Sequence, residues 1–184
     1  MNKWLKISIA LVSLLLVVAP AAGCLKGPTG LTEDQFKRLL TLQDIQKLST
    51  PSNIELKGNF YNYKAAPDVD PVRTLHMNSY YGIVFMSDDT STGIALTVVD
   101  FDTITALQQN LRSIQAESQL QRMENPVGTA SLKREFNARG LGSVLVFQKG
   151  STLVELLTGV PDGATPFMTL QNLEVLARQI AGKF

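Results

Sequence analysis

The stretch that decides the fold is SVLVFQKGSTLVELL, residues 143–157. Its two halves are rich in β-branched and aliphatic residues and flank Gly150, which can adopt the positive φ that a tight turn requires. This pattern predicts a β-hairpin with strands at residues 143–148 and 152–157. Residues 144–147 are apolar on both faces of the strand, so the hairpin must be covered on both sides.

Four further strands are predicted upstream of this hairpin, and the last of them is short and carries three adjacent charges at residues 133–135, which suits the edge of a sheet. They lie at residues 54–63, 80–86, 93–99 and 130–136. Residues 83–86 are again apolar on both pleat faces, so this strand also needs cover on both sides. Short turns between neighbouring strands make the predicted sheet mostly antiparallel.

Three helical segments are predicted, one before the strands, one between the third and fourth strands, and one after the last strand. A capping box opens residues 32–48, which predict one bent helix or two short ones. A long amphipathic helix is expected to begin after Asp100 or Asp102 and to fade near Gln121. Thr169 is the expected N-cap of a last helix with an apolar face.

The element order is therefore α-βββ-α-βββ-α, and the fold class is α+β. The economical arrangement is a three-layer α/β/α sandwich with a mostly antiparallel sheet of about six strands. This order, with the closing hairpin and helix in residues 143–184, is similar to the PsbP-like fold, also seen in LpqN-type lipoproteins. The resemblance implies a non-catalytic module that binds other components or assists their assembly.

The beginning of the chain has the three parts of a secretory signal. Lys3 and Lys6 precede a mostly apolar run at residues 7–19, and Pro20 then ends the apolar helix before small residues. The run is shorter than the roughly 20 residues that a membrane-spanning helix needs.

The stretch Ala21-Ala22-Gly23-Cys24 resembles the lipobox of prokaryotic lipoproteins, although Leu is more common at its first position. The resemblance implies cleavage after Gly23 and a diacylglyceryl thioether on Cys24, which becomes the mature N-terminus. Two acyl chains hold a protein stably on a bilayer. The alternatives are a buried structural cysteine after an ordinary signal, or an uncleaved N-terminal anchor.

The expected organisation is a signal peptide at residues 1–23, a lipidated cysteine with a tether at residues 24–31, and one globular domain at residues 32–184. We expect the protein on the extracytoplasmic face of the cell membrane. Cys24 is the only cysteine, so an intrachain disulfide is excluded. Removal of the signal takes away two lysines and no acid, which changes the net charge from +1 to −1. This balance does not indicate nucleic-acid binding.

No catalytic, metal or phosphate-binding motif is evident. His76, the only histidine, would have to serve any Ser-His-Asp arrangement, and Ser79 is near it, but no Gly-x-Ser-x-Gly sequence surrounds a serine. A zinc site needs three or four ligands, which one histidine and a lipidated cysteine cannot supply. Residues 139–142 lack the lysine of a phosphate-binding loop. We expect a protein that is not an enzyme and has no cofactor or metal.

Four tyrosines are the candidate partner-binding residues: Tyr61, Tyr63, Tyr80 and Tyr81. Packed tyrosine rings often contribute much of the binding energy at interfaces, but aromatic residues at strand spacing also form cross-strand pairs in a core. The first functional hypothesis is a lipid-tethered binding or assembly module. The second is a carrier of a small apolar ligand between the sheet and a helix layer, which requires a cavity. The third is a hydrolase that uses His76.

Overall fold

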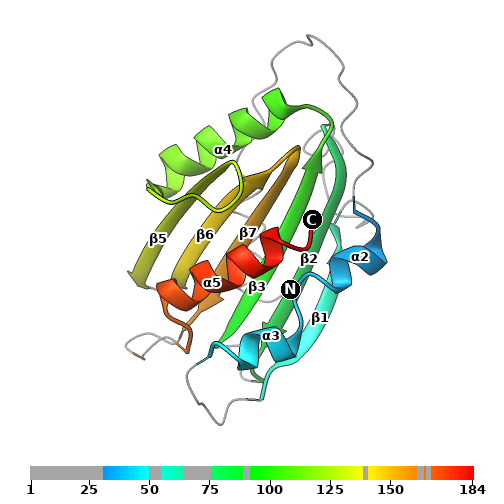
Figure 1. Cartoon of the computed structure of the whole chain (residues 1–184). Helices are drawn as coiled ribbons and strands as arrows, with labels where there is room; N and C mark the ends of the chain where they lie inside the picture. Colours follow the sequence, from blue (N-terminus) through cyan, green and yellow to red (C-terminus); the bar gives the residue numbers. More distant parts are fainter. Residues whose placement is uncertain are drawn as a thin grey trace.

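The computed structural model describes residues 31–49, 55–63, 76–88, 92–138, 141–160, 164 and 167–184. The predicted signal peptide, the lipobox with Cys24 and all but the last residue of the tether lie outside these residues, as does the start of the first predicted strand at Ile54. The described chain is α+β and contains one seven-stranded sheet and four helices (Figure 1).

The sheet is antiparallel between every pair of neighbouring strands that the structure describes. Its order is β1-β2-β3-β7-β6-β5-β4. The strands are β1 (Lys57–Asn62), β2 (Met77–Met86), β3 (Gly93–Phe101), β4 (Gln121–Arg122), β5 (Ala130–Ala138), β6 (Leu141–Lys149) and β7 (Thr152–Gly159).

The α+β class and the mostly antiparallel sheet are confirmed, but the described sheet has seven strands where about six were predicted. The additional strand is β4, which consists of two exposed residues. A strand of two residues is too short to show any alternation of apolar and polar side chains. The order in the described chain is accordingly two helices, three strands, one helix, four strands and one helix.

The predicted hairpin is formed by β6 and β7. Lys149 pairs with Thr152 across the turn, and Gly150 has a φ of +60°. Residues 142–148 of β6 and all of β7 are buried, as expected for strands that are apolar on both faces. The hairpin places β7 beside β3 in the middle of the sheet.

The first two helices are short and separately capped. They are α2 (Glu33–Lys37) and α3 (Leu42–Gln46), each opened by a capping box. In the first, the side chain of Thr32 accepts from the main-chain N–H of Gln35, and the Gln35 side chain accepts from the main chain of Thr32. The predicted segment is therefore two helices rather than one bent helix.

The two long helices are α4 (Ile104–Ser118) and α5 (Leu170–Ala181). Thr169 caps α5 as predicted. The N-cap of α4 is Thr103, so the prediction of Asp100 or Asp102 was wrong. Asp100 instead belongs to β3 and is buried, where its carboxylate accepts hydrogen bonds from neighbouring side chains.

The buried apolar residues form two clusters, which we name after the long helices. The α5-side core unites α2, α3 and α5 with residues such as Leu156 of β7, and the α4-side core unites α4 with residues such as Leu157. Alternate residues of a strand point to opposite faces of a sheet, so the two cores lie on different faces. Leu31 and Phe184, at the two ends of the described chain, both pack on the α5-side core. Figure 1 shows α2, α3 and α5 over the same face.

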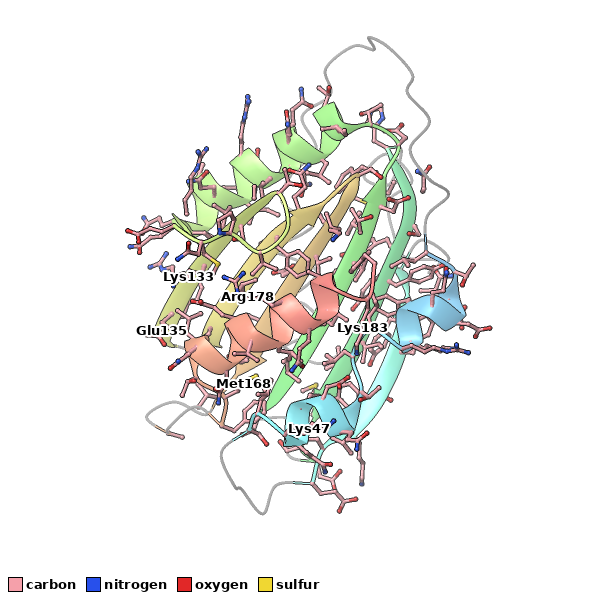
Figure 2. The ribbon with its side chains drawn as sticks, in the orientation of Figure 1. Lys47, Lys133, Glu135, Met168, Arg178 and Lys183 are labelled. Carbon is pink, nitrogen blue, oxygen red and sulfur yellow. The ribbon has the colours of Figure 1, made fainter. Side chains whose placement is uncertain are left out.

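The C-terminal end of α5 is fastened to the two N-terminal helices. Lys183 Nζ donates to the main-chain oxygens of Arg38 at 3.3 Å and Leu39 at 3.0 Å, and to the carboxylate of Asp44 at 3.0 Å. Figure 2 shows Lys183 at this end of α5. Burial alone would raise the pKa of Asp44, but the hydrogen bonds to its carboxylate outweigh burial and hold the pKa below its usual range.

Helix α4 connects the middle of the sheet with its edge. The chain leaves the central strand β3, forms α4, and enters β4 at the end of the sheet, beyond β7, β6 and β5. Because the helix packs on one face during this crossing, its last turns lie beside the short edge strand β4 and its partner β5.

Candidate functional site

A groove of about 340 Å³ lies between α4 and the edge of the sheet. It is larger than a hollow of about 180 Å³ that lies beside α3. Its walls come from α4, from the segment that begins with β4, and from β5 and β6. The lining residues are Gln108, Leu111, Arg112, Gln115, Arg122, Met123, Pro126, Thr129, Ala130, Ser131, Leu132 and Gln148.

The first wall is one side of α4. Gln108, Leu111, Arg112 and Gln115 are spaced at three and four residues, which places them on one side of a helix. Arg134 of β5 donates through Nη1 to the main-chain oxygen of Ser118 at 2.6 Å, so the last turn of α4 is tied to the sheet. This wall is held at its C-terminal end by a charged group.

The opposite wall is the segment from residue 123 to residue 129, which is braced by hydrogen bonds from its main-chain N–H groups. The N–H of Met123 donates to the main-chain oxygen of Ser131 at 3.1 Å, and the N–H of Val127 donates to Ser131 Oγ at 3.0 Å. Thr129 N–H donates to the main-chain oxygen of Gln148 at 2.9 Å. Gly128 has a φ of +65°, and a Cβ there would meet the Gln148 oxygen at 2.1 Å, so this close approach requires glycine.

Arg178 of α5 also supports this wall. Its guanidinium donates from α5 to the main-chain oxygens of Asn125 at 2.8 Å and Pro126 at 3.4 Å. Figure 2 shows Arg178 beside α5, between this helix and the segment that follows β4. Both walls are thus fixed by contacts outside the groove, which is typical of a preformed binding site.

The groove combines an apolar floor with a positively charged rim. Leu132 is buried, Leu111 is half-buried, and Met123 is 9% exposed. Arg112 and Arg122 are exposed and line the groove, and no carboxylate lines it. Within the part of the chain that the structure describes, neither guanidinium makes a hydrogen bond or an ion pair.

The four tyrosines singled out from the sequence do not form one surface. Tyr81 packs on the α5-side core, where its ring centroid lies 5.3 Å from that of Phe36. Tyr61, Tyr63 and Tyr80 belong to the α4-side core. The Tyr61 and Tyr63 rings are stacked at 5.8 Å, and the Tyr63 and Tyr80 rings lie 4.6 Å apart. Partner binding by these tyrosines stays a prediction.

Their exposure separates the tyrosines into two pairs. Tyr63 and Tyr80 are each 5% exposed, and burial raises the pKa of both hydroxyls. Tyr61 and Tyr81 are half-buried. Two of the four rings can therefore reach a partner without a change in the packing of the core.

Glu155 is a buried carboxyl that the sequence reasoning missed. It lies in the middle of β7, is 3% exposed, and faces the α4-side core next to Thr97 of β3. In the described structure neither carboxyl oxygen has a hydrogen-bond partner, and burial raises the pKa of Glu155 to about 8. A single glutamate inside the apolar run LVELL is the signal that could have revealed it.

His76 has one of the partners that a hydrolase would need. Its Nδ1 lies 3.0 Å from Asp102 Oδ2, and the main-chain oxygen of His76 accepts from the N–H of Asp102 at 2.9 Å. A catalytic arrangement also requires a nucleophile within hydrogen-bond reach of the histidine. The described contacts of the His76 ring supply the acid and no such nucleophile.

The remaining sequence predictions concern metals and the membrane. The described residues contain no group of three or more His, Cys, Asp or Glu side chains that could hold a metal ion. Among the described helices, none has the length and apolar character to cross a bilayer. Cys24 lies outside the described residues, so its lipidation stays a prediction.

Comparisons with known proteins bear on the fold. No model of a known protein family matches the chain, and no curated protein sequence matches it. Among solved structures, the chain is similar to the extracellular domain of PknH from Mycobacterium tuberculosis, with a TM-score of 0.56 and 12% sequence identity. The match covers 85% of this chain and 98% of that domain. At this identity the similarity concerns the fold alone.

Proposed function

We propose that the protein is a membrane-anchored extracytoplasmic module that binds a ligand without catalysing a reaction. The observation that carries the proposal is the groove beside α4, with two fixed walls, an apolar floor and a volume of about 340 Å³. Small-molecule sites typically have volumes of about 300–1,000 Å³ and are largely preformed. The groove is therefore a candidate site for a small ligand.

The proposed location depends on Cys24. Its position after small residues supports lipidation, and an extracytoplasmic domain agrees with the likeness to an extracellular domain. A lipid on Cys24 would hold the module at the membrane surface, where its local concentration is high. We also propose the predicted three-layer arrangement, which is supported by the two cores on different faces of the sheet.

Two related functions fit the same surface. A carrier of a small apolar ligand would use the groove as well, because Leu111 and Leu132 lie in it between α4 and the sheet. An assembly module would use the half-buried rings of Tyr61 and Tyr81 against a protein partner. Neither function requires a cofactor, a metal or nucleic acid.

The anchor is tested by mass spectrometry of the membrane-extracted full chain beside the variant Cys24→Ser. We expect the natural protein to begin at residue 24, to carry a diacylglyceryl group and to sediment with membranes. The variant should lack the lipid and appear in the aqueous fraction. An unmodified and unprocessed N-terminus on the natural chain would contradict the anchor.

The binding site is tested with a panel of fragment-sized molecules, using ligand-observed NMR on the full chain in lipid nanodiscs. Ala130→Trp fills the groove, whereas the matched control Ala116→Trp adds the same ring on the exposed side of α4. We expect fragments whose binding persists in the control and disappears when the groove is filled. Equal binding to both variants would place the ligand elsewhere and contradict the proposal.

A further inference from the structure

We infer that the groove beside α4 takes an amphipathic anion, with a carboxylate or phosphate group held by Arg112 and Arg122 and an apolar part on Leu111 and Leu132. The inference rests on the proposed function and adds the chemical class of the ligand. Three features of the described structure support it: the positive charge of the groove lining, the lack of hydrogen-bond and ion-pair partners for the two guanidiniums, and the apolar side chains at the bottom of the groove.

The lining has a net positive charge. Its two charged residues are Arg112 of α4 and Arg122 of β4. The nearest carboxylates in sequence, Glu117 and Glu124, are exposed and do not line the groove. A site with two cations and no acid attracts an anion and disfavours a cation.

The two guanidiniums are available for a ligand. In the described residues every salt bridge is made by other side chains, and Arg112 and Arg122 donate no hydrogen bond. A guanidinium presents five N–H donors in a planar fork that matches the two oxygens of a carboxylate or phosphate. The side-chain amides of Gln108 and Gln115 add neutral donors on the same wall.

The floor indicates that the ligand is more than an inorganic ion. Leu111 and Leu132 line the groove from α4 and β5, and a bare phosphate would leave the exposed part of the half-buried Leu111 in water. Covering such carbon surface stabilises binding by about 25 cal/mol for each Å² removed from water. A volume of about 340 Å³ also exceeds what one phosphate group fills.

The test uses phenyl phosphate, inorganic phosphate, benzyl alcohol and benzylammonium as probes on the full chain in phosphatidylcholine nanodiscs, with ligand-observed NMR titration. The variants are Arg112→Gln, Arg122→Gln and their combination. Arg38→Gln is the matched control, because Arg38 is exposed at the end of α2 and does not line the groove. Empty nanodiscs give the background.

We expect phenyl phosphate to bind more tightly than benzyl alcohol or inorganic phosphate, and benzylammonium not to bind. Each single substitution should weaken phenyl phosphate binding about tenfold or more, which is the size expected for a charged hydrogen bond. Arg38→Gln should leave the affinity unchanged. Filling the groove with Ala130→Trp should abolish binding, and Gln115→Trp serves the same purpose if that variant does not fold.

Other results overturn the inference in distinguishable ways. If benzyl alcohol binds as well as phenyl phosphate and only the filling variants matter, the groove is a ligand site but not an anion site. If inorganic phosphate binds as tightly as phenyl phosphate, the apolar part of the ligand is wrong. If no probe responds to the filling variants, Arg112 and Arg122 are solvated surface arginines, and both the inference and the proposed function fail.

Discussion

The α5-side core and the α4-side core share one sheet but differ in what they bury. The α5-side core is a continuous set of apolar side chains that extends from α2 to α5. The α4-side core contains two buried tyrosines, and Glu155 lies on the same face of the sheet. The face that carries the groove is therefore also the face on which a buried carboxyl lacks a hydrogen-bond partner among the described residues.

Two buried carboxyls, Asp100 and Glu155, differ in whether their oxygens have hydrogen-bond partners. Asp100 is 2% exposed, and its oxygens accept hydrogen bonds from Ser151 at 3.0 Å, Thr152 at 3.1 Å and Asn78 at 3.3 Å. Glu155 is 3% exposed, and its oxygens accept none from the described residues. A buried polar group without a partner costs about 1–3 kcal/mol, and more if it is charged. The α4 side thus combines the groove with an electrostatic cost, as functional regions often do.

The largest change in stability is expected from a substitution in the α5-side core. Phe36→Ala removes a fully buried ring that packs against Phe60 and Tyr81. We expect the free energy of unfolding to fall by about 3–5 kcal/mol, measured by urea denaturation, because a large buried side chain leaves a cavity. Ile104→Ala, at a position that is 53% exposed, is the control and should change it by less than about 0.5 kcal/mol. A loss below about 1 kcal/mol for Phe36→Ala would contradict the described packing.

The second effect sharpens the contrast between the two carboxyls. Because burial raises the pKa of Glu155 from 4.5 to about 8, the folded protein holds this proton over a range where the unfolded chain has lost it. The contribution of the Glu155 carboxyl to the free energy of unfolding is therefore fully present below pH 4.5 and decreases as the pH rises to about 8. Between pH 6 and pH 9 the decrease should be roughly 3 kcal/mol.

Glu155→Gln should remove this decrease, since an amide does not ionise. The measurement is urea denaturation at several pH values. Glu135→Gln is the control, because Glu135 lies in β5 and is exposed. The control should keep the pH dependence of the natural protein. An unchanged pH dependence in Glu155→Gln would show that the Glu155 carboxyl is stabilised by contacts beyond those described.

The third effect concerns the aromatic packing of the α4 side. A Cβ at Gly82 would meet the Tyr63 ring at 2.5 Å, because this ring lies where a side chain at position 82 would be. We expect Gly82→Ala to destabilise the protein by about 1–3 kcal/mol through overpacking. The double variant Gly82→Ala with Tyr63→Leu should recover part of the loss. The changes in the free energy of unfolding of the two single variants, measured by thermal or urea denaturation, should therefore not add up to the change in the double variant. Additive effects would mean that the clash is relieved elsewhere.

The smallest effect compares two hydroxyls. Tyr80 Oη is buried without a partner among the described residues, so Tyr80→Phe should change the free energy of unfolding by less than about 0.5 kcal/mol or increase it. Thr152 donates to Asp100, so Thr152→Val should cost about 1 kcal/mol. The two values come from the same urea titrations. A larger loss at Tyr80 than at Thr152 would reverse the proposed contrast.

The sequence was most informative where structure depends on neighbours along the chain. The hairpin around Gly150 and the N-cap at Thr169 were predicted correctly, because turns and caps depend on a few adjacent residues. Strand β4 could not be predicted from two polar residues, and it pairs with β5 only because α4 brings the chain to the edge of the sheet. The cap of α4 was misplaced because β3 continues to Phe101.

The candidate site was less accessible to prediction. Arg112 is exposed, as is usual for a polar residue of an amphipathic helix, but that it lines one groove together with Arg122 depends on how α4 crosses the sheet. Arg122 and Gln148 reach the groove from β4 and β6, which are far apart in sequence. Local patterns give the exposure of single residues, whereas a groove needs the relative placement of several elements.

The bonds of Lys183 have a consequence for how the domain would stand on a bilayer. They join the end of the chain after α5 to α2 and α3, and Leu31 and Phe184 pack on the α5-side core, so both ends of the described chain lie on the α5 side. A lipid on Cys24 would leave six residues before Leu31, a reach of at most roughly 20 Å. The α5 side would then face the lipid headgroups, and the groove beside α4 would face the aqueous phase.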